Sequence, residues 1–366
     1  MLTIEKLASF GGGLPVAADL TALLKKVRDV YEGEDFPCRP RAGGLLDFTK
    51  ERLPVIIVPD LHARPDFLIN LLKFTPDGLD GKNVLEALNE GRIIVVCVGD
   101  GVHTERYGEV VKAERMNDAK ELWKDDYERW MESFVSWQKG RINCPSMREE
   151  MRLCLATVMT VMELKCAFPK NFHFLKGNHE NIKNEDGRGN HAFRKFAMEG
   201  EMVKDFMQEV YGNGVLNLMY DYETSLPIVA AFDRFCVSHA EPERVFSKDE
   251  IIDYHGENWN EVVLAFTWTP NDGADEGSVA SIFAELTGRT ADTVPALWFG
   301  GHRPVEGKYF PRQDGHYVQI HNPDKMNVVS ISAERLRELE ESPRDQKNWE
   351  PWLDAWLDNC IISVKK

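Results

Sequence analysis

The chain has 366 residues, of which 43% are hydrophobic and 28% are charged, a composition typical of a globular protein with a large core. It carries 60 acidic and 44 basic residues, and its formal charge of −16 excludes broad binding to the phosphate backbone of nucleic acid. A small phosphorylated substrate stays compatible with this charge, because bound metal ions can reverse the local field.

The cysteines and the apolar runs indicate a cytoplasmic protein. The seven cysteines are scattered and contain no C-x-x-C pair, which favours a reducing compartment. Met1–Leu20 lacks a basic segment followed by a long apolar stretch, so we expect no signal peptide. No window approaches the roughly 18 consecutive apolar residues that cross a bilayer, and we therefore expect no membrane partner.

Residues 1–52 are predicted to form a leader, loose as far as Gly13, and a helix. Apolar residues recur in this helix at the spacing of one helical face, at Leu20, Leu23, Leu24, Val27 and Val30.

A catalytic domain is predicted over residues 53–332, where short apolar runs typical of buried strands alternate with helical stretches. The helical stretches include Phe67–Phe74 and Met151–Leu164. The predicted strands are Val55–Val58, Ile93–Val98, Phe172–Leu175, Ile228–Val237, Ala296–Phe299, Tyr317–Ile320 and Val328–Ile331. This alternation predicts an α/β fold with helices over a central sheet.

Two further segments are rich in tryptophan. Glu105–Gln138 is dense in charge and predicts one or two amphipathic helices, within a helical insertion at about residues 104–147. This insertion is interpreted either as a cap over the strand ends or as an ordinary surface helix pair. Residues 333–366 form a predicted helical extension, whose Trp349, Trp352 and Trp356 are expected to anchor it to the body.

Polar residues follow the ends of five predicted strands. The strand ends are followed by Asp60 and His62, by Asp100, by Asn178 and His179, by His239 and by His302. In open α/β sheets this carboxyl edge is where ligands bind. Burying so many polar groups together costs several kcal/mol unless a metal ion or another partner satisfies them. Imidazole and carboxylate ligands without thiolate suit Mn, Fe or Zn, and a carboxylate such as Asp100 can bridge two ions.

The ordered motifs Asp60-x-His62, Gly99-Asp100, Gly177-Asn178-His179-Glu180, His239 and Gly301-His302 resemble those of the calcineurin-like metallophosphoesterases. The phosphoprotein-phosphatase branch of that superfamily is the closer match. Segments outside the ligands are similar too, and the resemblance spans about Leu53 to Ser332. The similar segments are Ala167–Phe172, Ser225–Ala231 and Trp268–Asp272.

The resemblance implies a metallophosphoesterase fold: two packed mixed β-sheets flanked by helices, an α/β/β/α sandwich, with two metal ions at the carboxyl edge. It implies that Asp60 and His62 hold the first metal ion and that Asp100 bridges both. The second ion would be held by Asn178, His239 and His302. His179 resembles the proton donor to the leaving-group oxygen; the alternative is a hydrogen-bonding role behind the ligands.

The second motif departs from the branch pattern Gly-Asp-x-x-Asp-Arg-Gly. His103 stands where an Asp orients the catalytic histidine, and Thr104 stands where an Arg binds phosphate. We therefore assign His103 to the catalytic group beside His179. Because two imidazoles cannot both be cationic at low cost, Glu105 or another acid is expected to support His179.

A second phosphate-binding arginine is also replaced, since the later Asp-Arg-Gly of the branch reads Asp275-Glu276-Gly277. Three arginines that follow motifs are candidate replacements, because a guanidinium suits bidentate contact with phosphate. They are Arg64, Arg106 and Arg303.

The leading hypothesis is a phosphatase that hydrolyses phosphomonoesters, phosphoserine or phosphothreonine in proteins among them, by attack of a hydroxide that bridges two metal ions. Mn is the favoured metal, with Fe and Zn as alternatives. A second hypothesis keeps the metal core but takes a dinucleoside polyphosphate or a phosphodiester as substrate. A third is a metal-binding scaffold that has lost catalysis. The sequence leaves the physiological substrate, the native metal pair and the oligomeric state open.

Overall fold

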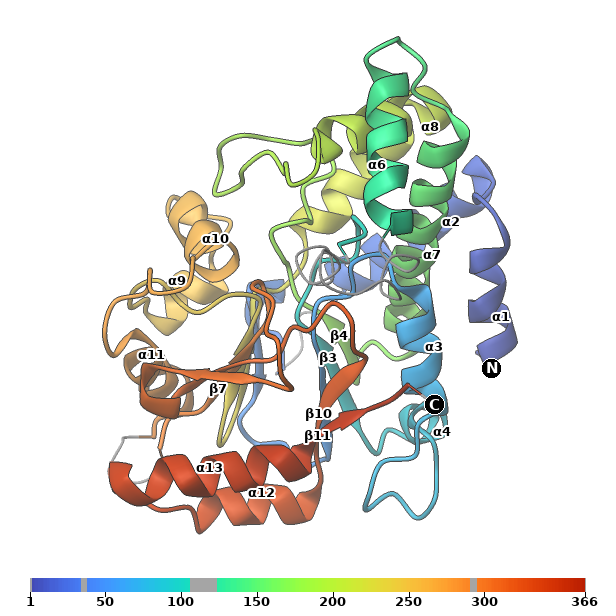
Figure 1. The fold of residues 1–366 in the computed structure, drawn as a ribbon. Helices are drawn as coiled ribbons and strands as arrows, with labels where there is room; N and C mark the ends of the chain where they lie inside the picture. The colour runs from blue at the N-terminus through green and yellow to red at the C-terminus, as the bar shows by residue number, and fades with distance from the viewer. Residues whose placement is uncertain (1, 34–37, 106–123, 290–294, 366) are drawn as a thin grey trace.

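Two mixed β-sheets packed face to face form the centre of the molecule, and helices cover both outer faces (Figure 1). This computed structural model describes residues 2–33, 38–105, 124–289 and 295–365. The arrangement confirms the predicted α/β/β/α sandwich.

The five-stranded sheet has the strand order β11-β10-β2-β3-β4. Its strands are β2 (Val55–Val58), β3 (Ile94–Cys97), β4 (Phe172–Phe174), β10 (Asn327–Ile331) and β11 (Ile361–Ser363). β2, β3 and β4 are parallel, whereas β10 is antiparallel to both β2 and β11. The carboxyl ends of three strands that carry predicted site residues therefore meet at one edge.

The six-stranded sheet has the order β1-β5-β6-β7-β9-β8. Its strands are β1 (Leu45–Phe48), β5 (Val229–Phe232), β6 (Cys236–Ser238), β7 (Trp298–Gly300), β8 (Phe310–Arg312) and β9 (Tyr317–Gln319). β6, β7 and β9 run parallel to one another, so the residues that follow them also lie at a common edge.

Side-chain alternation divides the core into layers. On β2, Val55 and Ile57 face the core between the sheets, while Ile56 and Val58 face the helices on the outer side. A strand that is buried on both faces reads as a continuous apolar run, which explains why β2 was predictable to the residue.

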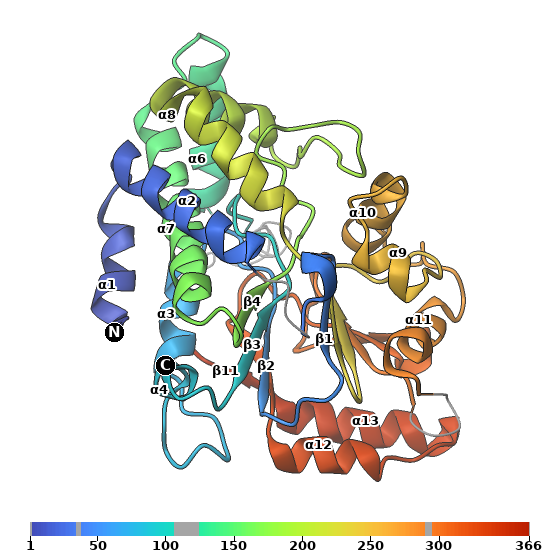
Figure 2. The ribbon, with the colours of Figure 1, turned by 180° about the vertical axis from the view of Figure 1, so that it is seen from behind.

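Helices on the outer face of the five-stranded sheet form the larger layer (Figure 2). They are α1 (Ile4–Ser9), α2 (Ala17–Glu32), α3 (Pro65–Lys73), α4 (Val84–Asn89), α6 (Lys124–Trp137), α7 (Pro145–Ala167) and α8 (Glu199–Thr224). The other outer face is covered by α9 (Lys248–Ile252), α10 (Trp259–Thr267) and α11 (Ser278–Thr287).

The remaining helices, α12 (Ala333–Glu340) and α13 (Gln346–Cys360), lie across the end of the sandwich (Figure 1). Trp349 and Trp356 are buried against the core between the sheets, as expected of anchors, and Trp352 packs against them. Because α12 begins where β10 ends, and β10 is antiparallel to β2, this helix pair closes the end opposite the site.

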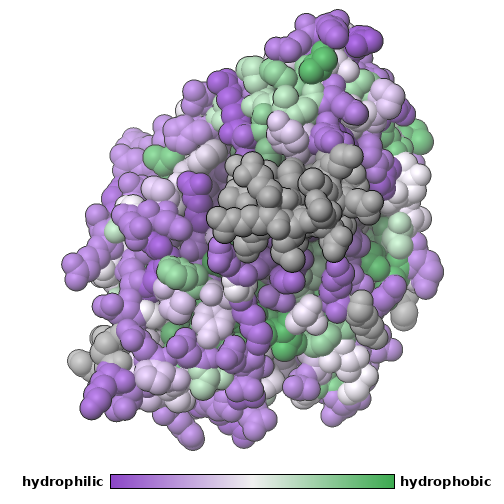
Figure 3. Space-filling view, viewed as in Figure 1, coloured by the Kyte–Doolittle hydropathy of each residue, from purple (hydrophilic) through white to green (hydrophobic). Residues whose placement is uncertain are grey.

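One face of the molecule is largely polar. Figure 3 shows hydrophilic side chains over most of the face seen in Figure 1, with hydrophobic ones in small separate groups. Among the described helices, none has the length and apolar character needed to cross a membrane.

Several local predictions need correction. The leader is not loose, because Ile4–Ser9 and Phe10–Gly12 are helical and Leu7 is buried in the core. The run Ile228–Val237 forms two antiparallel strands, β5 and β6, rather than one. Of the predicted insertion, α6 is described, while residues 106–123 lie outside the described part of the chain. The strands at both ends of the chain, β1 and β11, belong to the same two sheets as the predicted catalytic domain.

Candidate metal centre

All six predicted metal ligands lie together at the carboxyl edge of the two sheets. They come from the segments that follow β2, β3, β4, β6 and β7; five of the side chains are buried, and His302 is partly buried. The parallel strands bring these segments together although up to 242 positions separate them, as between Asp60 and His302.

The first group contains Asp60, His62 and Asp100. Nε2 of His62 lies 3.7 Å from Asp60 Oδ2 and 3.6 Å from Asp100 Oδ2. The same nitrogen lies 3.1 Å from Glu105 Oε2. The first group is therefore strongly acidic.

The second group shares Asp100 and adds the other three predicted ligands. Nε2 of His239 lies 2.8 Å from Asn178 Oδ1 and 3.5 Å from Asp100 Oδ2, while Nδ1 of His302 lies 3.0 Å from Asn178 Oδ1. Asp100 thus stands between the two groups, in the place where a shared ligand is needed.

These residues fit a pair of metal ions. Two ligand atoms that are each about 2.1 Å from one ion lie at most about 4.2 Å apart, and the separations above fall within that limit. Six of the buried side-chain atoms that lack a hydrogen-bond partner among the described residues lie here: Asp60 Oδ1, both ring nitrogens of His62, His302 Nε2 and both ring nitrogens of His321. Buried polar atoms are normally satisfied, so this cluster indicates ligand atoms.

Burial and mutual charge shape the protonation of the site. Burial would raise the pKa of Asp60, but the imidazoles of His321, His239 and His62 outweigh it and hold this pKa well below its usual range. Burial, followed by the charges of Asp60 and Glu180, raises the pKa of Asp100. Burial lowers the pKa of His239 to about 4 and that of His321 to about 3, so both imidazoles are neutral near pH 7 and can coordinate a metal ion.

The backbone is strained at four residues of the candidate site. His62, Asp100, His103 and His302 all have positive φ angles, between 42° and 65°. Such angles are uncommon outside glycine and cluster at functional sites. Glu180 holds the two neighbouring loops in place, because its carboxylate accepts hydrogen bonds from the backbone N–H groups of Asp100, Gly101 and Gly177.

His179 and His103 form a pair beside the metal ligands. Their Nδ1 atoms are 3.0 Å apart, so one ring donates and the other accepts. Burial, followed by the neighbouring His62, lowers the pKa of both rings, that of His103 to about 3. Glu105 contacts His62 and pairs with Lys195 at 2.8 Å. The hydrogen-bonding partner of His179 is thus His103, and the proton-donor role stays a prediction.

The three candidate arginines have different surroundings. Arg64 is buried and donates to the backbone carbonyls of Asp60, Leu61, Pro323 and Lys325, so it joins two loops rather than facing a substrate. Its role as a phosphate ligand stays a prediction.

Arg106 lies outside the described residues, whereas Arg303 is exposed at the mouth of the site. Sequence reasoning missed other residues of this mouth, including Phe193 and Lys195 in the loop between β4 and α8. The ring of Phe193 lies 3.8 Å from that of His179 and 4.7 Å from that of His103, measured between centroids. The adjacent basic pair Arg194-Lys195 was the available signal, but a basic pair in a long loop is common.

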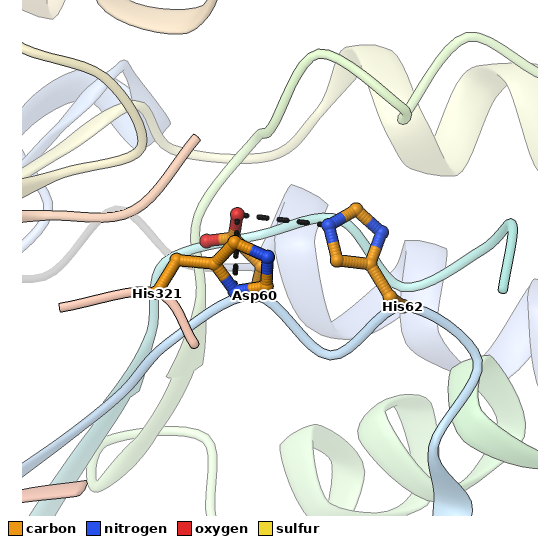
Figure 4. Close-up of side chains that lie close together, drawn as sticks. All are labelled: Asp60, His62 and His321. Atoms are coloured by element: carbon orange, nitrogen blue, oxygen red, sulfur yellow. Dashed lines mark ion pairs between the residues drawn. The ribbon is translucent and has the colours of Figure 1, made fainter. Parts of the chain in front are cut away.

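His321 was missed as well. It directly follows Ile320, the last residue of a predicted strand, so the rule that identified the candidate ligands would also have identified it. Its ring lies beside Asp60 and His62 (Figure 4).

Comparison with known proteins supports the fold. Neither protein-family models nor curated proteins match the sequence. The structure is similar to a protein serine/threonine phosphatase from Saccharomyces cerevisiae with similarity to human phosphatase PP5. The TM-score is 0.51 and the sequence identity is 13%, and the match covers 90% of this chain and 89% of that one. It also matches the cold-active protein-tyrosine phosphatase of a psychrophilic Shewanella species, with a TM-score of 0.40 and 13% identity, over 76% and 75% of the two chains. At 13% identity, the similarity to the yeast phosphatase shows that the two chains share a fold.

Proposed function

We propose that this protein is a binuclear metal-dependent phosphatase that hydrolyses phosphomonoesters, with phosphoserine and phosphothreonine residues of proteins as the leading substrates. One observation carries the proposal: buried, unpartnered nitrogen and oxygen atoms from separate strand ends converge at ligand spacing in a phosphatase-type fold. The fold alone would not suffice, because a fold can host many chemistries.

Asp60, His62 and Asp100 would hold one metal ion, and Asp100, Asn178, His239 and His302 the other. When bound, two such ions lower the pKa of a shared water molecule and offset the charge of the phosphoryl oxygens. We favour Mn, with Fe and Zn as alternatives. The scattered cysteines, none of which forms a disulfide, support a cytoplasmic location.

The surrounding residues would position the substrate. His179 would donate a proton to the leaving-group oxygen, with its ring fixed by His103 and by the face of Phe193. Arg303 and Lys195 line the mouth beside His179 and would contact the phosphate in place of the branch arginines that the sequence lacks.

The test compares turnover of an aryl phosphate by wild type and Asp100→Asn, with Mn, Fe and Zn in turn. We expect a loss of more than about 100-fold, because the substitution removes a shared anionic ligand from both ions. Asp66→Asn, on the exposed first turn of α3, is the matched control and should behave as wild type. In the same assay, His179→Asn should lower turnover by about 10²–10⁴-fold while metal content is retained.

Undiminished activity of Asp100→Asn would refute the proposal. Parallel assays on a phosphopeptide, bis-p-nitrophenyl phosphate and a dinucleoside tetraphosphate identify the substrate class. We expect the phosphopeptide to be hydrolysed best.

A further inference from the structure

His321 is a buried histidine beside the first metal group. It follows β9, two residues beyond Gln319, and it is 0% exposed. Neither Nδ1 nor Nε2 has a hydrogen-bond partner among the described residues. A neutral imidazole carries one N–H donor and one acceptor nitrogen, and leaving both unused in the interior is unfavourable.

The ring of His321 points into the first metal group (Figure 4). Its Nδ1 lies 3.6 Å from Asp60 Oδ2, which is too long for a hydrogen bond but suits two ligands of one ion. On the other side of the same carboxylate, His62 Nε2 lies 3.7 Å from Asp60 Oδ2. One ligand atom from each of these three residues can be chosen so that all lie within 4.8 Å of one another.

The two proposed metal groups are unequal without this histidine. The second group has four protein ligands, Asp100, Asn178, His239 and His302, whereas the first has only Asp60, His62 and the shared Asp100. His321 approaches the first group from β9, a strand that supplies no other proposed ligand.

We propose that His321 is a fourth protein ligand of the first metal ion. This inference rests on the proposed binuclear function and deepens it. With a second imidazole, the first group combines two nitrogen and two carboxylate ligands, which favours Zn, Fe or Mn over Mg. A fourth protein ligand also leaves fewer positions on this ion for water or substrate. With His321, both ions would have four protein ligands, and the two ions would be equally shielded from water and substrate.

The test measures metal binding directly, without an activity assay. Protein freed of metal by a chelator is titrated with Co²⁺, and the bound equivalents, their affinities and the visible absorption of the complex are recorded. Wild type should bind two equivalents. His321→Ala should retain one tight site and bind the other at least about 10-fold more weakly, with an altered absorption spectrum because a nitrogen ligand is lost.

His316→Ala is the matched control. His316 directly precedes the same strand, at its opposite end, and its Nδ1 is bonded to the carbonyl of Ala296 at 2.7 Å. This variant should bind two equivalents with the spectrum of wild type. If His321→Ala does not fold, as judged by circular dichroism, His321→Gln preserves more of the side-chain volume and takes its place.

The outcomes separate the inference from the function on which it rests. Wild-type protein that binds no Co²⁺ would overturn the binuclear function itself. Two equivalents in both wild type and His321→Ala, with equal affinity and equal spectra, would overturn only the role of His321. Weaker binding with an unchanged spectrum would make His321 a positioning residue for Asp60 and would likewise overturn its role as a ligand.

Discussion

Glycines beside the proposed ligands allow two loops to approach within contact distance. A Cβ built on Gly301 would overlap Asp60 Oδ1, and one built on Gly177 would overlap Asp100 Oδ1. Both carboxylates belong to the proposed metal centre, so these glycines are needed for space rather than for an unusual backbone angle. They explain in physical terms why Gly precedes His302 and Asn178 in the motifs.

We predict that Gly301→Ala displaces the carboxylate of Asp60 and weakens metal binding by at least about 10-fold, because ligand position is set by such close packing. Metal content after dialysis, measured by elemental analysis, tests this prediction. Gly307→Ala is the control, since a Cβ at Gly307 meets nothing closer than 3.8 Å. Equal metal content in Gly301→Ala and wild type would show that the Asp60 loop can shift freely.

At the same scale, the sequence was sufficient to predict candidate ligands, because each combines a ligand-type side chain with a position just after a predicted strand. Asp60, Asp100 and His302 follow short buried strands, and the structure brings all three together. Whether a side chain is buried or exposed was not predictable in this way. Arg64 follows a motif as Arg303 does, but only tertiary packing decides that the first is buried under backbone carbonyls and the second is exposed.

At the scale of elements, predictability follows burial. The strands β2, β3 and β10 are apolar over most of their length, and they were predicted within one residue at each end. In contrast, β8 contains Pro311 and is partly exposed at the edge of its sheet, and it carries no apolar run. Short edge strands such as β8 and β11 are fixed by their neighbours rather than by their own composition.

β4 and α7 meet at a buried histidine whose surroundings disfavour its protonated form. His173 lies on β4; its Nε2 is bonded to the carbonyl of Lys170, and its Nδ1 lies 3.2 Å from the ammonium group of Lys165 on α7. Burial, followed by the charge of Lys165, lowers the pKa of His173 well below its ordinary value. The ring is therefore neutral in the folded protein at pH values where the unfolded chain binds a proton.

A folded-state pKa below the unfolded value of about 6.5 means that this contribution to stability is present above pH 6.5 and is lost as the pH falls. Between pH 7.5 and 5.5 the loss amounts to about 1.4 kcal/mol for a group of this kind. We predict that His173→Gln, although less stable at pH 7.5, loses about 1.4 kcal/mol less than wild type over this range.

Urea unfolding of chelator-treated protein at the two pH values measures this difference. Treatment with chelator removes any contribution from metal binding, and the remaining histidines are common to both proteins. An equal loss of unfolding free energy in wild type and His173→Gln would contradict the assignment of a neutral buried ring.

At the scale of the whole molecule, the formal charge of −16 and the buried carboxylates of the site both destabilise the folded state. Asp60, Asp100, Glu105 and Glu180 are all buried around the candidate metal centre. Lys195 lowers the pKa of Glu105, and Lys176 offsets part of the rise that burial causes in the pKa of Glu180. Burying carboxylates in excess of cations is costly, and this cost falls on the folded state alone. We therefore expect the protein to have a lower unfolding free energy when no cation is bound at the site.

Two bound ions should relieve that instability. A ligand that binds only the folded state stabilises it by about 2.7 kcal/mol when its concentration is 100 times its dissociation constant, hence by about 5 kcal/mol for two such ions. We predict that Mn²⁺ added to chelator-treated protein raises the unfolding free energy by about this amount. The increase is measured as a shift of the urea midpoint, with Mg²⁺ at the same concentration as the control for ionic strength.

Asp100→Asn, which lacks the shared ligand, should show less than half of the wild-type increase, because both ions lose affinity together. An equal increase in wild type and Asp100→Asn would show that Mn²⁺ acts on the acidic surface rather than between the two sheets.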